Sequence, residues 1–398
     1  MNPPDLGELL RVEGGRVLAT LIRVTGDIDL AEDALQDAVV VALERWRTAG
    51  IPESPGAWLT TVARNRALDR LRREAKRRQK ETEALLSFVP NESDDRLQLI
   101  FTCCHPALSL EARVALTLRL IGGLTAADIA RLFLQPEATV AQRITRAKKK
   151  IAVVRIPYRI PQDSELPDRM VAVLAVIYLI FTGGHHAHEG ALDSRTDLAV
   201  EGIRLGRMLA LLMPDDAEAQ GLLALMLSTH ARRRARLDAE GNLVLMAHQD
   251  RSQWDHAAIA QAAGLVERAL RRRRPGPYQI QAAVSCLHGL APNDEETDWP
   301  QILALYDLLE SRHPGPVVTV NRAVALSKVN GPQAALAGIA HVTGLENWHL
   351  FWATKADFLR QLGEEQAAAE SYRRALELDM NDTDRRFLAG RLASLDPR

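Results

Sequence analysis

A run of basic and amide side chains between residues 139 and 150 has the composition of a nucleic-acid-binding helix. Gln and Arg side chains can hydrogen-bond to base edges, and Lys side chains can neutralise phosphates. No acidic residue occurs from residue 138 to residue 151. The polar residues of the run are Thr139, Gln142, Arg143, Thr145, Arg146, Lys148, Lys149 and Lys150. Most charge runs are merely solvated helix faces, so the interpretation depends on the elements that would position these side chains.

Those elements have the pattern of a helix-turn-helix. Thr125 is followed three residues later by Asp128, a capping-box spacing that predicts a helix beginning near Thr125. The break at residues 134–136 ends that helix, and Pro136 fits the first turn of a second one. Apolar residues of the second helix recur at steps of three and four, as Val140, Ile144, Ala147 and Ile151. They form one buried stripe and leave the basic residues facing outward.

A second basic segment extends from Arg64 to Lys80. This segment contains nine Lys and Arg residues and only two acidic residues, Asp69 and Glu74. The whole chain of 398 residues, in contrast, has a formal net charge of -1. The local electrostatic potential is therefore a better guide to binding partners than the net charge of the chain. Ser54 and Pro55 start the helix that carries this segment, and Leu59, Ala63, Ala67, Leu71 and Ala75 form its apolar stripe.

Two clusters of metal-type donors also stand in the sequence. Cys103, Cys104 and His105 are adjacent, and three adjacent residues cannot close a tetrahedral site without distant help. His185, His186, His188 and Glu189 lie among glycines. We interpret the first cluster as the packed start of a helix and the second as a tight turn between helices, so that no metal is expected. A metal at the histidines stays open as the alternative.

Helical periodicity dominates the chain, and no alternation flanked by hairpin signals stands out, so we predict an all-α fold. Two helices, broken near Gly26, are expected from Arg11 to Trp46. Polar or proline-rich stretches mark two linkers. The predicted division is a first helical domain at 1–88, a linker at 89–96, the helix-turn-helix domain at 97–155, a proline-rich linker at 156–167, and a helical extension at 168–398.

The extension contains a pattern like that of a tetratricopeptide unit. Large, small, turn and aromatic positions of such a unit fall on Trp352, Ala356, Leu359, Gly363, Ala368, Tyr372 and Ala375. A weaker copy precedes it by about 33 residues, close to the tetratricopeptide period. Such units stack into a curved array with a concave surface, which predicts a protein or peptide ligand for the extension.

The cellular compartment is predicted from cysteine usage and from the apolar segments. Three cysteines, two of them neighbours, cannot build a disulfide framework, which fits a reducing cytoplasm. The first residues lack the basic and apolar segments of a secretion signal. The longest apolar run, Met170 to Phe181, is shorter than the ~20 residues that cross a bilayer, so a buried helix and no membrane contact are expected.

With these pieces together, the chain resembles an extracytoplasmic-function (ECF) RNA polymerase sigma factor of the subfamily with a C-terminal tetratricopeptide-like extension. The resemblance is carried by "SPGAWLTTVARNRALDRLRRE" (Ser54 to Glu74), "LIFTCCHPALSLEARVALTLRLIGGLT" (Leu99 to Thr125) and "PEATVAQRITRAKKKI" (Pro136 to Ile151). It implies two small sigma domains, regions 2 and 4, followed by a helical regulatory extension. It also implies core RNA polymerase, through its β′ clamp helices and β subunit, and promoter DNA as partners.

The resemblance assigns roles residue by residue. The helix from Asp29 to Trp46 would bind the β′ clamp helices with Asp33, Gln36 and Asp37. The next helix would read the minus-ten element as single-stranded bases with Arg64, Asn65, Arg70, Arg72 and Arg73. The helix after Pro136 would enter the major groove of the minus-35 element with Thr139, Gln142, Arg143, Arg146, Lys148, Lys149 and Lys150. Trp46 and Trp58 are either stacking surfaces for unpaired bases or core residues.

The predicted function is therefore a bacterial sigma factor that binds core polymerase and directs promoter-specific transcription initiation, with an extension that modulates its activity. The alternative is a conventional helix-turn-helix regulator whose extension senses a ligand or protein, and the segment from Asp29 to Lys80 distinguishes the two. No phosphate-binding loop, nucleophile elbow or paired-cysteine redox motif is present, so neither catalysis nor a cofactor is expected.

Overall fold

The computed structural model describes residues 6–78, 95–133, 135–185 and 192–395. The described residues form helices and no strand. An isolated antiparallel β-bridge joins Leu237 and Leu243. The predicted all-α fold is thus confirmed. The chain divides into two compact units, residues 1–183 and residues 184–398. Helix α8 (Leu166–His185), which the sequence assigns to the extension, lies almost wholly within the first unit.

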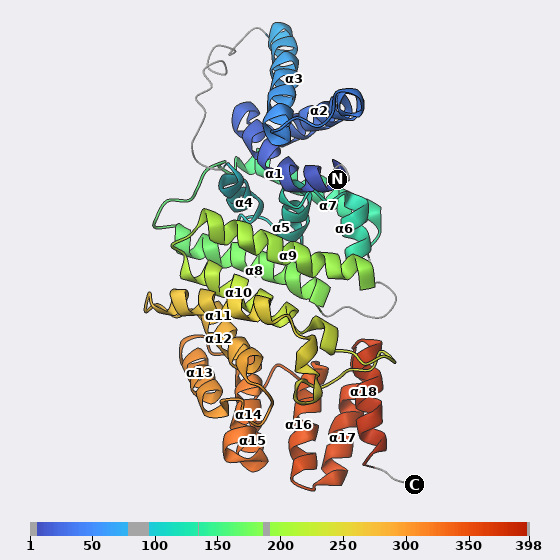
Figure 1. The fold of residues 1–398 in the computed structure, drawn as a ribbon, viewed down its shortest axis with the longest axis vertical. Helices are drawn as coiled ribbons and strands as arrows, with labels where there is room; N and C mark the ends of the chain where they lie inside the picture. The colour runs from blue at the N-terminus through green and yellow to red at the C-terminus, as the bar shows by residue number, and fades with distance from the viewer. Residues whose placement is uncertain (1–5, 79–94, 134, 186–191, 396–398) are drawn as a thin grey trace. The chain divides into compact units, whose positions relative to one another are not determined.

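The first unit begins with a three-helix bundle made of α1 (Leu6–Thr25), α2 (Ile28–Ala49) and α3 (Pro55–Arg78), drawn in blue in Figure 1. Asp27 caps α2 by accepting a hydrogen bond from the Leu30 N–H at 3.0 Å, which explains the break near Gly26. The side of α2 that faces α3 is made of alanines, and these small side chains let the two helices pack closely. The buried alanines of α2 are Ala31, Ala34, Ala38 and Ala42.

The rest of the first unit is a group of shorter helices. They are α4 (Arg96–Cys103), α5 (Leu110–Leu116), a π-helical turn η1 (Thr117–Ile121), α6 (Ala126–Leu132), α7 (Glu137–Val154) and α8. Their core contains the fully buried side chains of Phe101, Leu116 and Leu118. By length and composition α8 could cross a membrane, but one such helix is weak support for a span, and Val173, Val176, Ile180 and Phe181 are buried.

A buried carboxylate joins α1 to the segment that leads into α4. Asp95 is only 6 % exposed, and its two carboxylate oxygens accept hydrogen bonds from Arg23 Nε at 2.8 Å and Thr20 Oγ1 at 3.1 Å. The Tyr158 hydroxyl lies 2.8 Å from the Ala19 carbonyl oxygen and 3.2 Å from the Asp95 carbonyl oxygen. We call these five residues the Asp95 clasp. The clasp holds together α1, the start of α4 and the proline-rich segment before α8.

The second unit is a succession of antiparallel helices. They are α9 (Leu192–Leu212), α10 (Ala217–His230), α11 (His256–Leu270), α12 (Pro277–Leu290), α13 (Trp299–Arg312), α14 (Pro316–Asn330), α15 (Pro332–Ile339), α16 (His349–Gln361), α17 (Glu365–Leu376) and α18 (Asp382–Ala393). Three short 3-10 turns, η2 (Arg233–Ala235), η3 (Met246–His248) and η4 (Arg251–Gln253), connect α10 to α11. The last three helices, red in Figure 1, pack in sequence.

The stretch predicted as a tetratricopeptide unit forms the helical hairpin of α16 and α17. Gly363 makes the turn with φ 79°, a left-handed conformation that favours glycine. Ala356, Ala368 and Ala375 are fully buried at the crossing, and Tyr372 is 2 % exposed. Small residues at the crossing and one large aromatic beside it explain why the two helices pack closely.

Two histidines of the second unit make its stability depend on pH. Burial, with Arg233 nearby, lowers the pKa of His230 to about 4, and burial, with Arg232 nearby, lowers the pKa of His288 to about 4. An unfolded chain takes up these protons at about pH 6.5, whereas the folded unit does not. Stability is therefore lost as the pH falls below about 6.5, by about 2 kcal/mol at pH 5 for His288 and by less for His230, which is more exposed and more strongly screened by water.

We expect His288→Gln to remove about half of the stability difference between pH 7 and pH 5. Denaturant unfolding of the wild-type and variant proteins at the two pH values measures that difference. His248→Gln, a change at an exposed histidine, is the matched control. An unchanged pH dependence in His288→Gln would contradict the assignment.

Candidate nucleic-acid interface

The helix-turn-helix is built by the capping box predicted at its start. The Thr125 N–H donates to Asp128 Oδ2 at 3.0 Å, and the Asp128 N–H donates in return to Thr125 Oγ1 at 3.0 Å. This reciprocal pair satisfies two N–H groups at the start of α6. Pro136 precedes α7 as its N-cap residue with φ -62° and ψ 137°, so α7 begins at Glu137, one residue later than predicted. Because the ψ angle of Pro136 is extended and not helical, this residue flanks α7 and is not part of it. Its missing N–H costs no hydrogen bond at this position.

Helix α7 presents its polar residues as predicted. Val140, Ile144, Ala147 and Ile151 are its buried residues. Thr139, Gln142, Arg146, Lys149 and Lys150 are exposed. A groove of about 340 Å³ between α5 and α7 brings five of the predicted residues together. These five are Thr139, Gln142, Arg143, Arg146 and Lys150.

Arg143 is held in place by a residue of the turn before α7. Its Nη1 donates to Gln135 Oε1 at 2.8 Å, so the turn between α6 and α7 orients the guanidinium. A guanidinium fixed in this way loses less side-chain entropy when it binds a base edge. Arg146, one turn further along α7, is exposed.

Lys148 occupies a different position from the other predicted residues of α7. Its side chain is 16 % exposed, and its ammonium donates to Asp29 Oδ1 at 2.8 Å and to Glu32 Oε2, both on α2. Arg119 Nη2 pairs with the other oxygen of Glu32 at 2.9 Å. Burial alone lowers the pKa of Lys148, but the hydrogen bonds to Asp29 and Glu32 outweigh it and raise that pKa. We call these four residues the lysine latch, because they hold the helix-turn-helix against α2.

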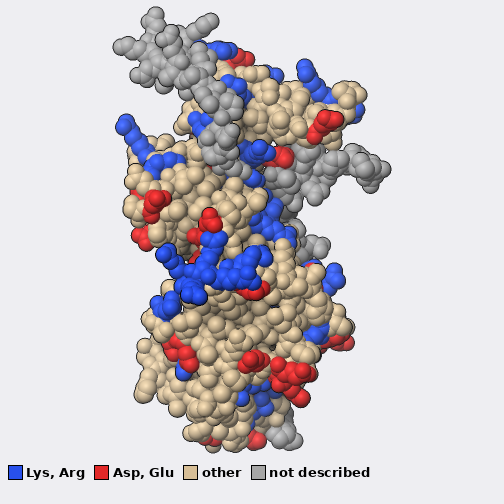
Figure 2. Space-filling model, turned by 60° about the vertical axis from the view of Figure 1, so that its left-hand side comes forward, with Lys and Arg blue, Asp and Glu red and all other residues tan. Residues whose placement is uncertain are grey.

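The predicted minus-ten face lies on α3. Asn65 is exposed, Arg64 is half-buried, and Arg72 pairs with Asp69 at 3.4 Å. Arg73 belongs to α3, but its side chain lies outside the described residues. Figure 2 shows that Lys and Arg side chains gather in patches on the surface and are not spread evenly. This uneven distribution agrees with a chain whose net charge is close to zero but whose helices are locally basic.

Arg70 links the two predicted interfaces of the three-helix bundle. Its Nη1 lies 2.8 Å from Asp33 Oδ2 and its Nη2 lies 2.7 Å from Asp37 Oδ2. The predicted polymerase-binding carboxylates and a predicted DNA-binding arginine therefore neutralise each other in this state. Gln36, the third predicted polymerase-binding residue, is exposed between them.

Two apolar residues that sequence reasoning missed extend the same face of α2. Val40 is 55 % exposed and Leu43 is 48 % exposed, although both are large and apolar. They follow Gln36 at steps of four and three, so the three side chains lie on one side of the helix. A groove of about 400 Å³ that includes Gln36, Val39 and Val40 runs beside them. Apolar residues at helical spacing that are not needed for the core were the signal that could have indicated this face of α2.

Trp46 and Trp58 pack against each other. Their ring centroids are 5.3 Å apart with the planes tilted by 59°, and both residues are half-buried. Trp46 Nε1 is buried without a hydrogen-bond partner among the described residues. The pair joins the end of α2 to the start of α3, and its half-exposed edge leaves both predicted roles open.

The predicted metal-type clusters are placed as follows. Cys103 and Cys104 are buried, and burial raises the pKa of Cys103 well above its usual value and that of Cys104 to about 11. Burial therefore favours the thiol form of both side chains over the thiolate, and the thiolate is the form that binds metals. His105 Nδ1 accepts the Ala107 N–H at 3.1 Å. No group of three metal-type donors occurs among the described residues, and residues 186–191 of the histidine cluster lie outside them.

We expect the roles of α7 residues to separate in a promoter-binding assay. Arg146→Ala should cost about 1–3 kcal/mol on a cognate minus-35 element, because a guanidinium that binds a guanine edge reads sequence. Lys149→Ala should weaken binding equally on cognate and scrambled DNA, because a phosphate contact carries no sequence information. Titration of both DNAs with polymerase holoenzyme measures the difference. Equal losses on the two DNAs for Arg146→Ala would remove its base-reading role.

Comparison with protein families agrees with this geometry. Residues 9–77 match sigma-70 region 2, and residues 98–151 match sigma-70 region 4. These two matches define the class, a sigma-70-type RNA polymerase sigma factor. Residues 169–270 match a family of unknown function, DUF6596.

Individual relatives narrow the class. The ECF RNA polymerase sigma factor SigK of Mycobacterium ulcerans is 32 % identical over 146 residues, covering 33 % of this chain and 75 % of SigK. SigK of Mycobacterium tuberculosis is 30 % identical over 148 residues, covering 34 % of this chain and 78 % of SigK. The uncharacterized protein R00370 of Rhizobium meliloti is 40 % identical over 394 residues, covering 96 % of this chain and 93 % of R00370. No solved structure matches the chain.

The chain belongs to the ECF RNA polymerase sigma factor family. Such proteins bind core RNA polymerase and promoter DNA and direct transcription initiation, and the family is not enzymatic. Family membership favours the sigma-factor prediction over the conventional regulator.

Proposed function

We propose that this sigma factor recognises the minus-35 element through the groove between α5 and α7 and binds core polymerase through the exposed face of α2. The observation that carries the proposal is the convergence of Thr139, Gln142, Arg143, Arg146 and Lys150 on one groove of the helix-turn-helix. A positively charged helix with Gln and Arg at its centre suits a major groove. We also propose that the predicted minus-ten residues of α3 bind the minus-ten element and that the protein acts in the cytoplasm.

In vitro transcription tests the proposal directly. Core polymerase and the purified chain should together produce a run-off transcript from promoters selected with the holoenzyme. Core polymerase alone and the chain alone should produce none. Absence of a stable complex between the chain and core polymerase in gel filtration would overturn the proposed α2 interface.

We further propose that the lysine latch keeps the free protein from binding DNA through Lys148. Lys148 cannot reach a phosphate while Asp29 and Glu32 hold its ammonium. Asp29 and Glu32 lie on α2, the helix that we assign to polymerase binding. Engagement of α2 by polymerase then competes with the latch and releases α7.

Asp29→Asn together with Glu32→Gln, which removes both carboxylates from Lys148, is expected to strengthen binding of the free protein to DNA and to steepen its salt dependence. One released lysine adds about one phosphate contact, so the slope of log affinity against log salt concentration should become more negative by about one. Filter binding of the free protein at several salt concentrations measures the slope. Glu44→Gln changes an exposed glutamate of the same helix and is the control. Identical slopes for wild type and the double variant would contradict the latch.

The helical extension is proposed to modulate the sigma domains and to form a tetratricopeptide-like array. The hairpin of α16 and α17, with its buried small residues, supports the second statement. Truncation of the chain tests whether the extension modulates the sigma domains. The truncated protein should end at Gly183 and not in the proline-rich linker, because α8 belongs to the first unit. Run-off transcription by residues 1–183, once circular dichroism shows that they are helical, should differ from that of the whole chain. An equal rate and promoter affinity would refute modulation.

A further inference from the structure

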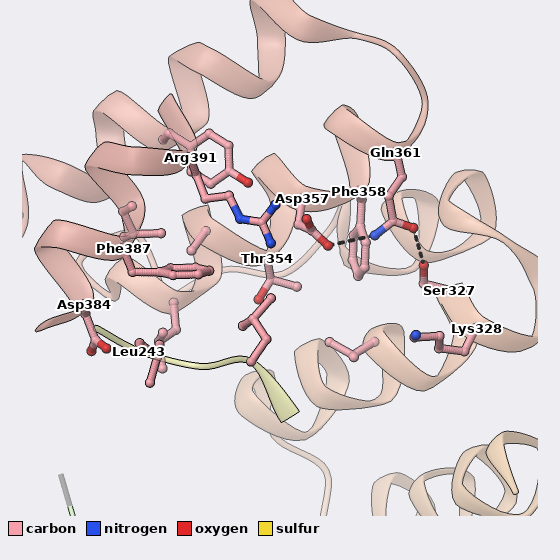
Figure 3. Close-up of a pocket in the computed structure, with 16 residues that line it drawn as sticks. Leu243, Ser327, Lys328, Thr354, Asp357, Phe358, Gln361, Asp384, Phe387 and Arg391 are labelled. Atoms are coloured by element: carbon pink, nitrogen blue, oxygen red, sulfur yellow. Dashed lines mark hydrogen bonds between the residues drawn. The ribbon is translucent and has the colours of Figure 1, made fainter. Parts of the chain in front are cut away.

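A cavity of about 270 Å³ lies among α14, α16, α17 and α18 in the second unit. Its walls are mostly apolar, and Figure 3 shows side chains of α16 and α18 turned toward a shared space. Leu350 and Phe358 of α16, Phe387 and Leu388 of α18, and Leu243 and Leu245 of the segment before η3 supply the apolar walls.

The charged residues of the wall have protein partners, with one exception. Lys328 pairs with Asp294 at 2.9 Å, Asp357 with Arg360 at 2.7 Å, and Asp384 accepts from Asn381 at 2.7 Å. The exception is Arg391, whose guanidinium carbon lies 5.3 Å from the centre of the Phe387 ring. No ion pair or hydrogen bond of that guanidinium is found with the described residues, and Figure 3 shows the side chain extending from α18 into the cavity.

An unpaired guanidinium between apolar walls favours an anion of a particular kind. A guanidinium binds a carboxylate through two parallel hydrogen bonds, and the partly dehydrated setting strengthens such a pair. The apolar walls stabilise a hydrocarbon body by removing it from water. We propose that the cavity binds a small amphipathic carboxylic acid, with its carboxylate on Arg391 and its apolar body against Leu245, Leu350 and Phe387.

The polar part of the wall argues against an extended peptide as the ligand. An extended peptide that enters a cavity buries backbone N–H and C=O groups, and these groups need hydrogen-bond partners from the wall. Here Gln361 Nε2 donates to Asp357 Oδ2 at 2.7 Å, and Gln361 Oε1 lies 3.5 Å from Ser327 Oγ. These groups satisfy one another, and the volume suits a small molecule.

The wall formed by residues 243–245 is fixed by contacts within the second unit. Asp238 accepts the Asn242 N–H at 2.7 Å in a tight turn, and Arg386 of α18 donates to the Gly241 carbonyl oxygen at 3.1 Å. The segment is therefore attached to the helix that carries Arg391. These contacts fix this wall of the cavity, and a fixed wall lowers the entropy cost of binding.

Isothermal titration calorimetry of the full-length protein with octanoate and with octanamide tests the proposal. The two probes share the apolar body and differ in charge. Octanoate should bind saturably at one site below its micelle-forming concentration, and octanamide should bind at least about tenfold more weakly, as expected when a charge-assisted hydrogen bond is lost. Arg391→Gln should reduce octanoate affinity to that of octanamide.

Arg374→Gln is the matched control, because Arg374 lies on neighbouring α17, pairs with Glu377 and does not line the cavity. Equal affinity for the two probes, no saturable binding of octanoate, or unchanged octanoate affinity in Arg391→Gln would each overturn the proposal. Saturable binding of a short peptide with a free C-terminus, without binding of octanoate, would also overturn it. If Arg391→Gln unfolds, the comparison of the two probes on wild type decides alone.

Discussion

Val40→Asp together with Leu43→Asp is expected to weaken binding to core RNA polymerase by at least about 100-fold. Both side chains are exposed in the free protein, so the double variant should fold normally. In the complex, however, two carboxylates would replace apolar groups at the centre of an interface, where such losses reach 2 kcal/mol or more. Fluorescence anisotropy of labelled protein titrated with core polymerase measures the affinity.

The control for this prediction is Arg45→Asp, which adds a carboxylate to the same helix on another side. It should leave polymerase affinity within about threefold of wild type, as expected for a charge at the rim. Equal losses in the control would show a general electrostatic effect and not a specific face. Asp33 and Asp37 make a less direct test, because replacing them also removes the two partners of Arg70.

Asp95→Ala is expected to lower the free energy of unfolding of the first unit by about 3 kcal/mol. The change removes a buried carboxylate and takes away the ion pair that this carboxylate makes with Arg23, whose side chain is 23 % exposed. Breaking a buried ion pair from one side costs about 3–5 kcal/mol, and the partial exposure of Arg23 places this case at the lower end. Urea unfolding followed by circular dichroism measures the loss.

Asp163→Ala, at an exposed position of the proline-rich segment, should change stability by less than about 0.5 kcal/mol. Because the chain has two units, the two variants should be compared in the transition that belongs to the first unit. A loss below about 1 kcal/mol for Asp95→Ala would mean that the clasp is not a significant source of stability.

Local patterns in the sequence predicted the helix-turn-helix in detail. The capping box at Thr125 and the buried stripe of α7 depend on residues three or four positions apart, and both occur as expected. The turn at Gly363 follows from the same kind of short-range rule. Spacing along one helix determines which side chains share a face, so these features need no knowledge of the tertiary structure.

Contacts between distant segments could not be predicted in this way. Lys148 and Glu32 are separated by 116 positions, and Lys148 belongs to a run whose other members are exposed, apart from the half-buried Arg143. Periodicity places Lys148 on the polar side of α7 but cannot tell which polar residue meets another helix. The Arg391 cavity likewise collects residues from four helices and a connecting segment. Its apolar residues look like ordinary core residues in the sequence.

The lysine latch also bears on how a sigma factor is distributed inside a cell. Chromosomal DNA offers a very large number of non-specific sites, and a basic protein free in solution would be retained on them by its phosphate contacts. Neutralising Lys148 with the carboxylates of α2 removes one such contact while the protein is alone. If the latch acts as we propose, a larger share of the protein stays free to meet polymerase, and full attraction to DNA returns only in the holoenzyme. The proposed latch would then order the encounters, with polymerase first and promoter second.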